Sequence, residues 1–343
     1  MELGIGMFGD LRIDEKGTIQ PAHQRLQELI EEIKLMDETG LDFFGIGEHH
    51  RPDYAVSAPE IVLAAAATVT KKIKLGSAVS VLSSADPVRL YQAFATIDGI
   101  SGGRAELVVG RGSFTESFPL FGYDLKDYDA LFEEKLELLL AVNKDQPVTW
   151  KGNFRPALTK QQVLPRAMND QLAIWVAVGG TPESVHRAAR LGLPVIFAII
   201  GGNPAHFKPL FDYYRKVYEH SGHDPEKLQV GVHMHAFFGE DSKRVATDYY
   251  PVYAAQMNRI GRQRGWPPYQ PQQYEQGRGA QGHLLIGDAS EAIDKILQVH
   301  ELFGLTRFSA HMDVGAPSHA TMMKSIEIFG TKIAPAVRKA LDK

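Results

Sequence analysis

The chain has 343 residues, of which 44% are hydrophobic and 23% are charged, and its formal net charge is −4. This composition is that of a globular protein with a sizeable core, and it excludes a basic field that would recruit nucleic acid or an anionic membrane. The lack of cysteine excludes disulfides, thiolate metal sites and a cysteine nucleophile. No signal peptide opens the chain and no apolar run is long enough to span a bilayer, so we expect a cytoplasmic protein.

Short apolar segments alternate with helical stretches along the chain, as in proteins with a buried parallel sheet. Eight strands are predicted, over residues 3–8, 42–47, 73–81, 106–109, 172–178, 194–200, 229–238 and 307–312. Helices are predicted over residues 24–39, 59–69, 86–102, 128–142, 182–191, 204–220, 242–260, 290–303 and 318–337. This alternation, without a break in composition, favours one (β/α)8 TIM barrel over residues 1–343 and not a doubly wound sheet.

Two segments interrupt the alternation. Residues 147–165, after the fourth unit, have the pattern of a hairpin excursion. Residues 261–285, GRQRGWPPYQPQQYEQGRGAQGHLL, are rich in Gly, Gln and Pro and show no periodicity. A loop of this length inside a compact domain is typical of a lid or a binding loop, so we expect an irregular lid after strand seven.

The chemistry of a TIM barrel lies at the carboxyl ends of its strands. Four segments with functional side chains occupy such positions in the predicted barrel. They are EHH at residues 48–50, SAV at 77–79, GRG at 110–112 and GGTPES at 179–184. All four are therefore expected on one rim.

The GGTPES segment has the features of an anion site. Gly180 allows a close backbone approach, and Thr181 and Ser184 add hydroxyls to the free amides of a helix N-terminus. Arg111, flanked by glycines, could grip a phosphate with two hydrogen bonds. The plainer alternatives are ordinary N-capping by Thr181 and a surface ion pair of Arg111.

Three interpretations compete for the EHH segment. A metal site is one, supported by His233 and His235 on strand seven, although adjacent residues of an extended chain point in opposite directions. Acid or base chemistry by His49 is the second, and it favours a histidine with a pKa near neutrality. The third is a histidine that bonds Glu48 for structural reasons, with His50 supporting the strand end.

Ordered motifs over nearly the whole chain resemble the bacterial luciferase-like, flavin-dependent monooxygenases. They are LDFFGIGEHH at residues 41–50, IKLGSAVSVLSSADPVRLYQAFATIDGISGGRAELVVGRG at 73–112, WVAVGGTPESVHRAARLG at 175–192 and MMKSIEIFGTKIAPAVR at 322–338. The resemblance implies a TIM barrel that uses reduced FMN and O2 to oxidise a small organic substrate. It also implies a separate NAD(P)H:flavin reductase as partner, a mobile lid and a homodimer.

The resemblance assigns roles to single residues. It implies that His49 is the catalytic histidine beside the isoalloxazine ring and that Glu48 lies near this ring. It also implies a cis peptide between Ala78 and Val79 under the ring. The phosphate would be held by four residues, which are Arg111, Gly180, Thr181 and Ser184.

The chain departs from the luciferase α chain at several positions. Gly110 occupies the place of a reactive cysteine, and Asp129 aligns loosely with a second phosphate-side arginine. These differences argue against light emission and aldehyde specificity, while FMN binding stays the expectation. The alternatives are a deazaflavin-dependent dehydrogenase or reductase of the same fold, a barrel metallohydrolase that uses the four histidines, and a flavin-binding protein without activity.

Overall fold

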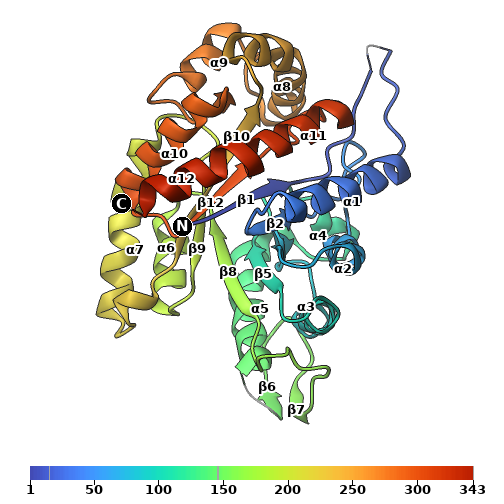
Figure 1. Cartoon of the computed structure of the whole chain (residues 1–343). Helices are drawn as coiled ribbons and strands as arrows, with labels where there is room; N and C mark the ends of the chain where they lie inside the picture. Colours follow the sequence, from blue (N-terminus) through green and yellow to red (C-terminus); the bar gives the residue numbers. More distant parts are fainter. Residues whose placement is uncertain (15, 145–146, 343) are drawn as a thin grey trace.

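A closed barrel of eight parallel strands forms the centre of the computed structural model, which describes residues 1–14, 16–144 and 147–342 (Figure 1). The strands pair in the order β1, β2, β3, β5, β8, β9, β10 and β12, and β12 returns to β1. Their bounds are β1 Glu2–Met7, β2 Phe43–Ile46, β3 Lys74–Ser77, β5 Ala105–Gly110, β8 Ala173–Val178, β9 Val195–Ala198, β10 Val230–Phe238 and β12 Arg307–His311. The predicted TIM barrel is confirmed.

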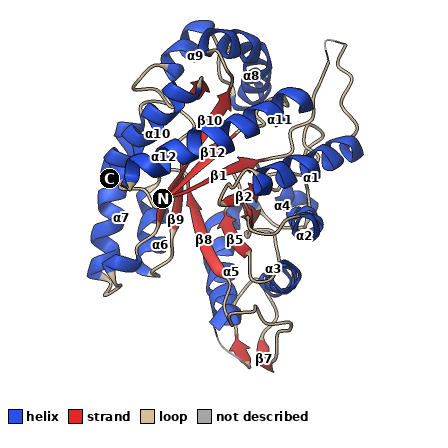
Figure 2. Cartoon of the chain, viewed as in Figure 1, coloured by secondary structure: helices blue, strands red, loops and turns tan. Residues whose placement is uncertain are grey.

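Helices surround the barrel and bury their apolar faces against it (Figure 2). They are α1 Ala22–Glu38, α2 Pro59–Val69, α3 Pro87–Ser101, α4 Ser117–Leu120, α5 Tyr128–Lys144, α6 Pro182–Arg190, α7 Lys208–His220, α8 Ser242–Arg264, α9 Pro271–Arg278, α10 Ala289–Phe303, α11 His319–Ile328 and α12 Ala334–Leu341. A π-helical turn, Phe329–Ile333, joins α11 to α12, so the helix predicted over residues 318–337 has a widened middle. No helix of the described chain is long and apolar enough to cross a membrane.

Local signals explain where α3 begins and ends. The Asp86 side chain accepts hydrogen bonds from the N–H groups of Val88 and Arg89, and Pro87 occupies the first helical turn. Gly102 ends the helix in the left-handed conformation at φ 74°. Arg104, which follows, donates to backbone carbonyls that include that of Ile73. These bonds hold the segment before β5 against the segment before β3.

The hairpin predicted over residues 147–165 is confirmed by the antiparallel pair β6 Val148–Trp150 and β7 Leu158–Gln161. The strand predicted over residues 73–81 is wrong in its continuity. It divides into β3 and a two-residue strand, β4 Ser80–Val81, with a cis peptide between Ala78 and Val79 at the break. A cis bond turns the chain out of the extended ladder, which a periodicity argument does not detect.

The prediction of one irregular loop over residues 261–285 is wrong. Helix α8 continues to Arg264 and ends at Gly265, and α9 and a short strand, β11 Leu285–Gly287, fill much of the rest. Pro271 fits the first turn of α9, and Gln270 and Gln273 form a reciprocal capping box there. The low periodicity of this segment hid an ordinary helix start, and α8 and α9 lie together in Figure 1.

An ion-pair cluster of Arg307, Glu2 and Glu106 fills the amino-terminal end of the barrel. The Arg307 guanidinium, 2% exposed, donates to the carboxylates of Glu2 and Glu106. It also lies 4.4 Å from the centroid of the Phe43 ring and 4.2 Å from that of Trp175. The barrel is therefore filled at its amino-terminal end and can hold a ligand only above this level.

Candidate active site

A cavity of about 270 Å³ lies inside the upper barrel and reaches the carboxyl ends of the strands. Small residues make room for it where barrel interiors usually carry branched side chains. The glycines and alanines that line it are Gly45, Gly76, Ala78, Gly110, Gly112, Ala177, Gly179 and Ala198. The volume is close to the lower end of ligand pockets, roughly 300 Å³.

The cis peptide between Ala78 and Val79 forms one wall of this cavity, and its predicted conformation is confirmed. Two glycines pack against it. A Cβ atom on Gly45 would lie 2.9 Å from the Cβ of Ala78, and one on Gly110 would lie 2.9 Å from a methyl group of Val79. A side chain at Gly110 would therefore displace this wall.

Glu48 holds the segment after the cis peptide from behind. Its backbone N–H donates to the carbonyl of Val79 at 3.2 Å, and its carboxylate accepts from the N–H of Val81 at 2.8 Å. The other carboxylate oxygen lies 2.8 Å from Nε2 of His50. The structural bond to Glu48 is thus made by His50 and not by His49, and neither Glu48 nor His50 is among the residues that line the cavity.

Arg111 lies at the mouth of the cavity, directly after β5. Its Nη1 is 2.5 Å from a carboxylate oxygen of Asp129, and its guanidinium stacks 5.2 Å from the centroid of the Tyr128 ring. Tyr128 in turn donates to the carbonyl of Gly112 at 2.6 Å. Arg111 is thus held beside the cavity, and Asp129 pairs with the guanidinium that would bind an anion.

The turn into α6 brings three further predicted residues to the same rim. Gly179 lines the cavity, and Gly180 follows with φ 112°, a conformation that favours glycine. Thr181 is at the N-cap position, but its hydroxyl pairs with that of Ser184 at 2.8 Å and caps no backbone N–H. The alternative of ordinary N-capping is therefore wrong for the Thr181 hydroxyl, although Thr181 does occupy the N-cap position. No side chain of the described residues caps the N–H groups of the first turn of α6, so its positive end is available to an anion.

His49 is buried, at 8% exposure, among aromatic side chains. Its ring lies 4.2 Å from that of Tyr54, 4.7 Å from that of Phe8 and 5.2 Å from that of Phe114, measured between centroids. Its Nδ1 is buried without a hydrogen-bond partner in the described chain. His49 itself is not among the residues that line the cavity, but its neighbour Phe8 is.

The pKa of His49 corrects one expectation. Burial, and then the nearby His311, lower it to about 3. The idea that a near-neutral pKa assists this residue is therefore wrong for this arrangement, because the imidazole is neutral throughout the physiological range. Its place in the apolar cage, which the local sequence does not reveal, causes the shift.

Three more histidines lie in the same region of the barrel. The rings of His233 and His311 lie 4.8 Å apart, and those of His235 and His311 lie 5.1 Å apart. His233 bonds Ser309 at 3.0 Å and His235 bonds the Tyr253 hydroxyl at 2.9 Å. Within the described residues, no group of three or more His, Asp or Glu side chains is placed to hold a metal ion. The geometry therefore gives the metallohydrolase alternative no support.

Asp313, just beyond β12, is the main residue that the sequence analysis missed. It accepts from the N–H groups of Phe8 at 3.0 Å and Gly9 at 2.8 Å, and it lies 3.2 Å from Nε2 of His311 and 3.6 Å from Arg25. Burial alone would raise its pKa, but His311, Arg25 and the N–H of Phe8 lower it to about 2. Asp313 thus fixes the segment that carries Phe8 into the cavity. The same test of strand ends, applied to the eighth strand, would have found it.

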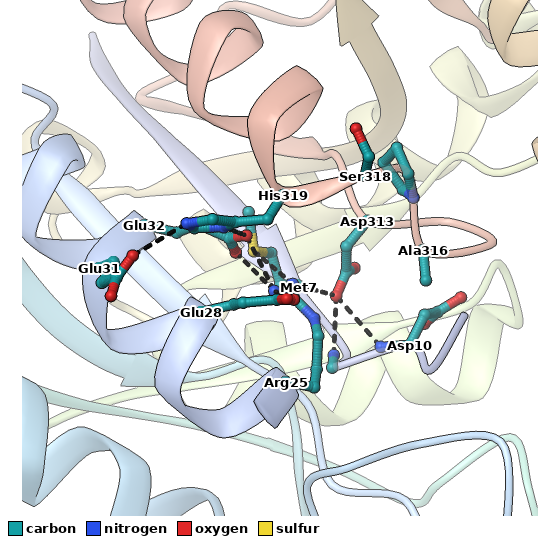
Figure 3. Close-up of polar contacts among 12 residues, drawn as sticks. Met7, Asp10, Arg25, Glu28, Glu31, Glu32, Asp313, Ala316, Ser318 and His319 are labelled. Carbon is teal, nitrogen blue, oxygen red and sulfur yellow. Dashed lines mark hydrogen bonds and ion pairs between the residues drawn. The ribbon is translucent and has the colours of Figure 1, made fainter. Parts of the chain in front are cut away.

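Arg25 extends this network to the outer helices. It bonds Glu32 of the same helix at 2.8 Å, and Glu32 accepts from His319 of α11 at 3.0 Å. Figure 3 shows Arg25 and Glu32 of α1 facing His319 and Asp313. The network ties α1 and α11 to the rim of the barrel.

A closed parallel barrel with its cavity at the carboxyl ends of the strands defines a TIM-barrel enzyme. A profile of the luciferase-like monooxygenases matches residues 1–306, and the chain belongs to this family. Among its relatives, the N-acetyl-S-alkylcysteine monooxygenase of Bacillus subtilis is 30% identical over 53% of each chain. The alkanal monooxygenase alpha chain of Photorhabdus luminescens is 29% identical over 56% of this chain and 52% of that one. The protein is thus an oxidoreductase.

Solved structures share the fold over 98% of this chain and 99% of their own. A monooxygenase of Streptomyces bottropensis superimposes with a TM-score of 0.85 at 22% identity. The oxygenating constituent of 3,6-diketocamphane monooxygenase of Pseudomonas putida, solved with FMN, gives 0.77 at 18%. A coenzyme F420-dependent tetrahydromethanopterin reductase of Methanopyrus kandleri gives 0.70 at 18%. At these identities the likeness shows the fold.

Proposed function

We propose that this protein is a monooxygenase that takes reduced FMN from a separate reductase and uses O2 to oxidise a small organic substrate. The observation that carries the proposal is the rim cavity walled by the cis peptide of Ala78 and Val79, with Arg111 at its mouth, in a chain of the luciferase-like monooxygenase family. The small residues of the wall leave space for a planar ring, and the wall is largely apolar, as ligand sites are.

Ala78 and Val79 would face the ring of the cofactor, while Arg111 and the α6 turn at Gly180, Thr181 and Ser184 would hold its phosphate. Glu48, which does not line the cavity, would support the segment after the cis peptide through its bond to Val81. The charges suit a phosphate, because Arg111 and Gly179 both line the cavity, and Gly179 leads directly into the positive end of α6. When bound, reduced FMN would supply two electrons, so that one oxygen atom of O2 enters the substrate and the other leaves as water.

His49 acts in this proposal as a neutral hydrogen-bonding group that lies behind Phe8, a residue of the cavity wall. Its unpartnered Nδ1 and its apolar cage of Phe8, Tyr54 and Phe114 suit a group that holds or moves one proton where water is excluded. His49→Ala should lower turnover at least tenfold while FMN affinity changes little, because removing a positioned acid or base typically costs a factor of 10² or more. Unchanged turnover would remove His49 from the mechanism.

A lid role for the segment after strand seven is part of the same proposal. Arg264 at the end of α8 donates to the carbonyl of Ser113 at 3.2 Å, and Ser113 lines the cavity. Gln263 accepts from Arg51 of the β2–α2 loop at 2.5 Å. The carboxyl end of α8 thus lies over the mouth, where closure would exclude water from the reaction.

A homodimer in the cytoplasm completes the proposal. Ile61 of α2 is 67% exposed, and Val69 of α2 and Ile100 of α3 are also exposed. These apolar side chains on two neighbouring helices favour contact with a second copy of the chain.

The dependence on a separate reductase is tested by assays of NADH consumption and product formation. The proposal predicts that both require the two proteins together.

The second candidate is a deazaflavin-dependent dehydrogenase or reductase, because an enzyme that depends on coenzyme F420 shares the fold. Parallel fluorescence titrations with FMN and with coenzyme F420 separate the two. The proposal predicts tight binding of FMN and weak binding of the deazaflavin. The reverse order, together with hydride transfer in the absence of O2, would replace it by the second candidate.

A further inference from the structure

His233 stands in the cavity wall, on the strand opposite the cis peptide. It belongs to β10, pairs in register with Ser309 of β12, and is 8% exposed. A Cβ atom on Gly6 would lie 2.5 Å from Cε1 of the ring, so only a glycine at that position leaves room for it. The barrel therefore accommodates an imidazole where an apolar side chain would be the ordinary filling.

One nitrogen of this imidazole is held and the other is free. Nδ1 lies 3.0 Å from the Ser309 hydroxyl, whereas Nε2 is buried without a hydrogen-bond partner in the described chain. Other deep polar groups of the wall are engaged, since Ser77 bonds both the carbonyl and the N–H of Val108. Leaving a buried polar atom unpaired costs about 1–3 kcal/mol, so a partner that arrives with a ligand would remove this cost.

The surroundings define the kind of partner. Burial, and then His311, lower the pKa of His233 well below its usual value, so the ring is neutral. Depending on the direction of the Ser309 hydroxyl, Nε2 can donate to a carbonyl or accept from an N–H or O–H group. Phe8 stacks on the His233 ring at 5.9 Å between centroids, Val108 and Ile196 also line the cavity, and the charged Glu106 and Arg307 of its wall pair with each other at 2.7 Å. A neutral ring with a carbonyl or amide edge fits these conditions better than an ion.

We infer that His233, oriented by Ser309, is a hydrogen-bonding subsite that recognises the carbonyl or amide edge of a neutral ring held in the cavity. The inference rests on the proposed function, because the ring belongs either to the flavin or to the organic substrate. His233 is a binding residue in this account, and Ser309 positions it.

The test compares His233→Phe with a matched control, His235→Phe. His235 is a buried histidine on the same strand, also bonded through Nδ1 to a hydroxyl, but it does not line the cavity. Fluorescence titrations measure the affinity for FMN and for riboflavin, which lacks the phosphate. The ring ¹⁵N signals of histidine-labelled wild-type protein are followed during titration with FMN and with cyclohexanone, the latter with and without FMN present.

Two results support the inference and identify the source of the ring. If the flavin edge is recognised, His233→Phe weakens FMN and riboflavin alike by about tenfold, the loss of one hydrogen bond. If the substrate is recognised, flavin affinity is retained, but cyclohexanone shifts the His233 ring signal and binds His233→Phe about tenfold more weakly. His235→Phe should change each affinity less than about twofold.

The inference is overturned if FMN and cyclohexanone leave the His233 ring signal of the wild-type protein unchanged. It is overturned equally if His233→Phe binds FMN, riboflavin and cyclohexanone as the wild type does. Failure of FMN to bind the wild-type protein is a different result and contradicts the proposed function. If FMN does not bind, the cyclohexanone titration without FMN still tests the role of His233. If His233→Phe does not fold, the ring ¹⁵N spectra of the wild-type protein provide the test.

Discussion

Asp129 provides a direct test of the phosphate site, because its carboxylate pairs with the same guanidinium of Arg111 that a phosphate would bind. The carboxylate is 67% exposed and lies 2.5 Å from Nη1 of the arginine. A phosphate on the same guanidinium would lie about 5 Å from this carboxylate. Repulsion between a single and a double negative charge at that distance in water is about 1.7 kcal/mol, and salt at physiological strength roughly halves it. Asp129→Asn should therefore tighten FMN binding about fourfold.

Arg111→Gln should act in the opposite direction. Loss of a charge-assisted hydrogen bond costs about 1.5–3 kcal/mol, which weakens FMN binding by about tenfold or more. Fluorescence titration with FMN and with riboflavin provides the measurement and its control, because riboflavin has no phosphate and should bind both variants as it binds the wild type. The reasoning is refuted if Asp129→Asn weakens FMN or leaves it unchanged, or if riboflavin affinity moves by the same factor.

Three further predictions concern stability and assembly. In the unfolded chain His49 takes up a proton with a pKa near 6.5, whereas in the folded state, with its pKa lowered to about 3, it stays neutral, so this group gives a stability slope of about 1 kcal/mol between pH 6.5 and pH 5.5, with less stability at the lower pH. Urea unfolding at pH 6.5 and 5.5 measures the loss of stability, which should be smaller by this amount in His49→Gln than in the wild type. An equal loss of stability in the two proteins would contradict the burial argument. Arg307→Met should cost about 3–5 kcal/mol in the same assay at pH 7, because it leaves the buried Glu106 without its main partner, whereas the half-exposed Lys74→Met should cost less than about 1 kcal/mol. Ile61→Glu should convert a dimer to monomers in sedimentation velocity with the secondary structure retained, and an unchanged sedimentation coefficient would exclude α2 from the interface.

The barrel was accessible from the sequence because its signals are local. Each strand is a short apolar run, and each helix carries its own stripe and caps, such as Asp86 and Gly102 at the two ends of α3. Arg111, the α6 turn and the Ala78–Val79 bond each lie at the end of a predicted strand, so the sequence also predicted that they share one rim. The register of parallel strands then brought these residues to one cavity without further information from the sequence.

The central cluster was not accessible in the same way. His311 meets Gly6 and His235 only through the pairing of β12 with β1 and β10. The pKa of His49 depends on a cage built from Phe8 and Phe114, residues distant from it in the sequence. Such properties arise from tertiary packing, and the helix α9 was missed because its composition concealed a normal capping box.

A crystal structure of the protein with reduced FMN tests the central claim most directly. The account predicts the isoalloxazine ring against Ala78 and Val79, with the phosphate between Arg111 and the first turn of α6. It also predicts that Asp129 has released the guanidinium. A flavin bound outside the barrel cavity, or with its phosphate away from both Arg111 and α6, would contradict the account.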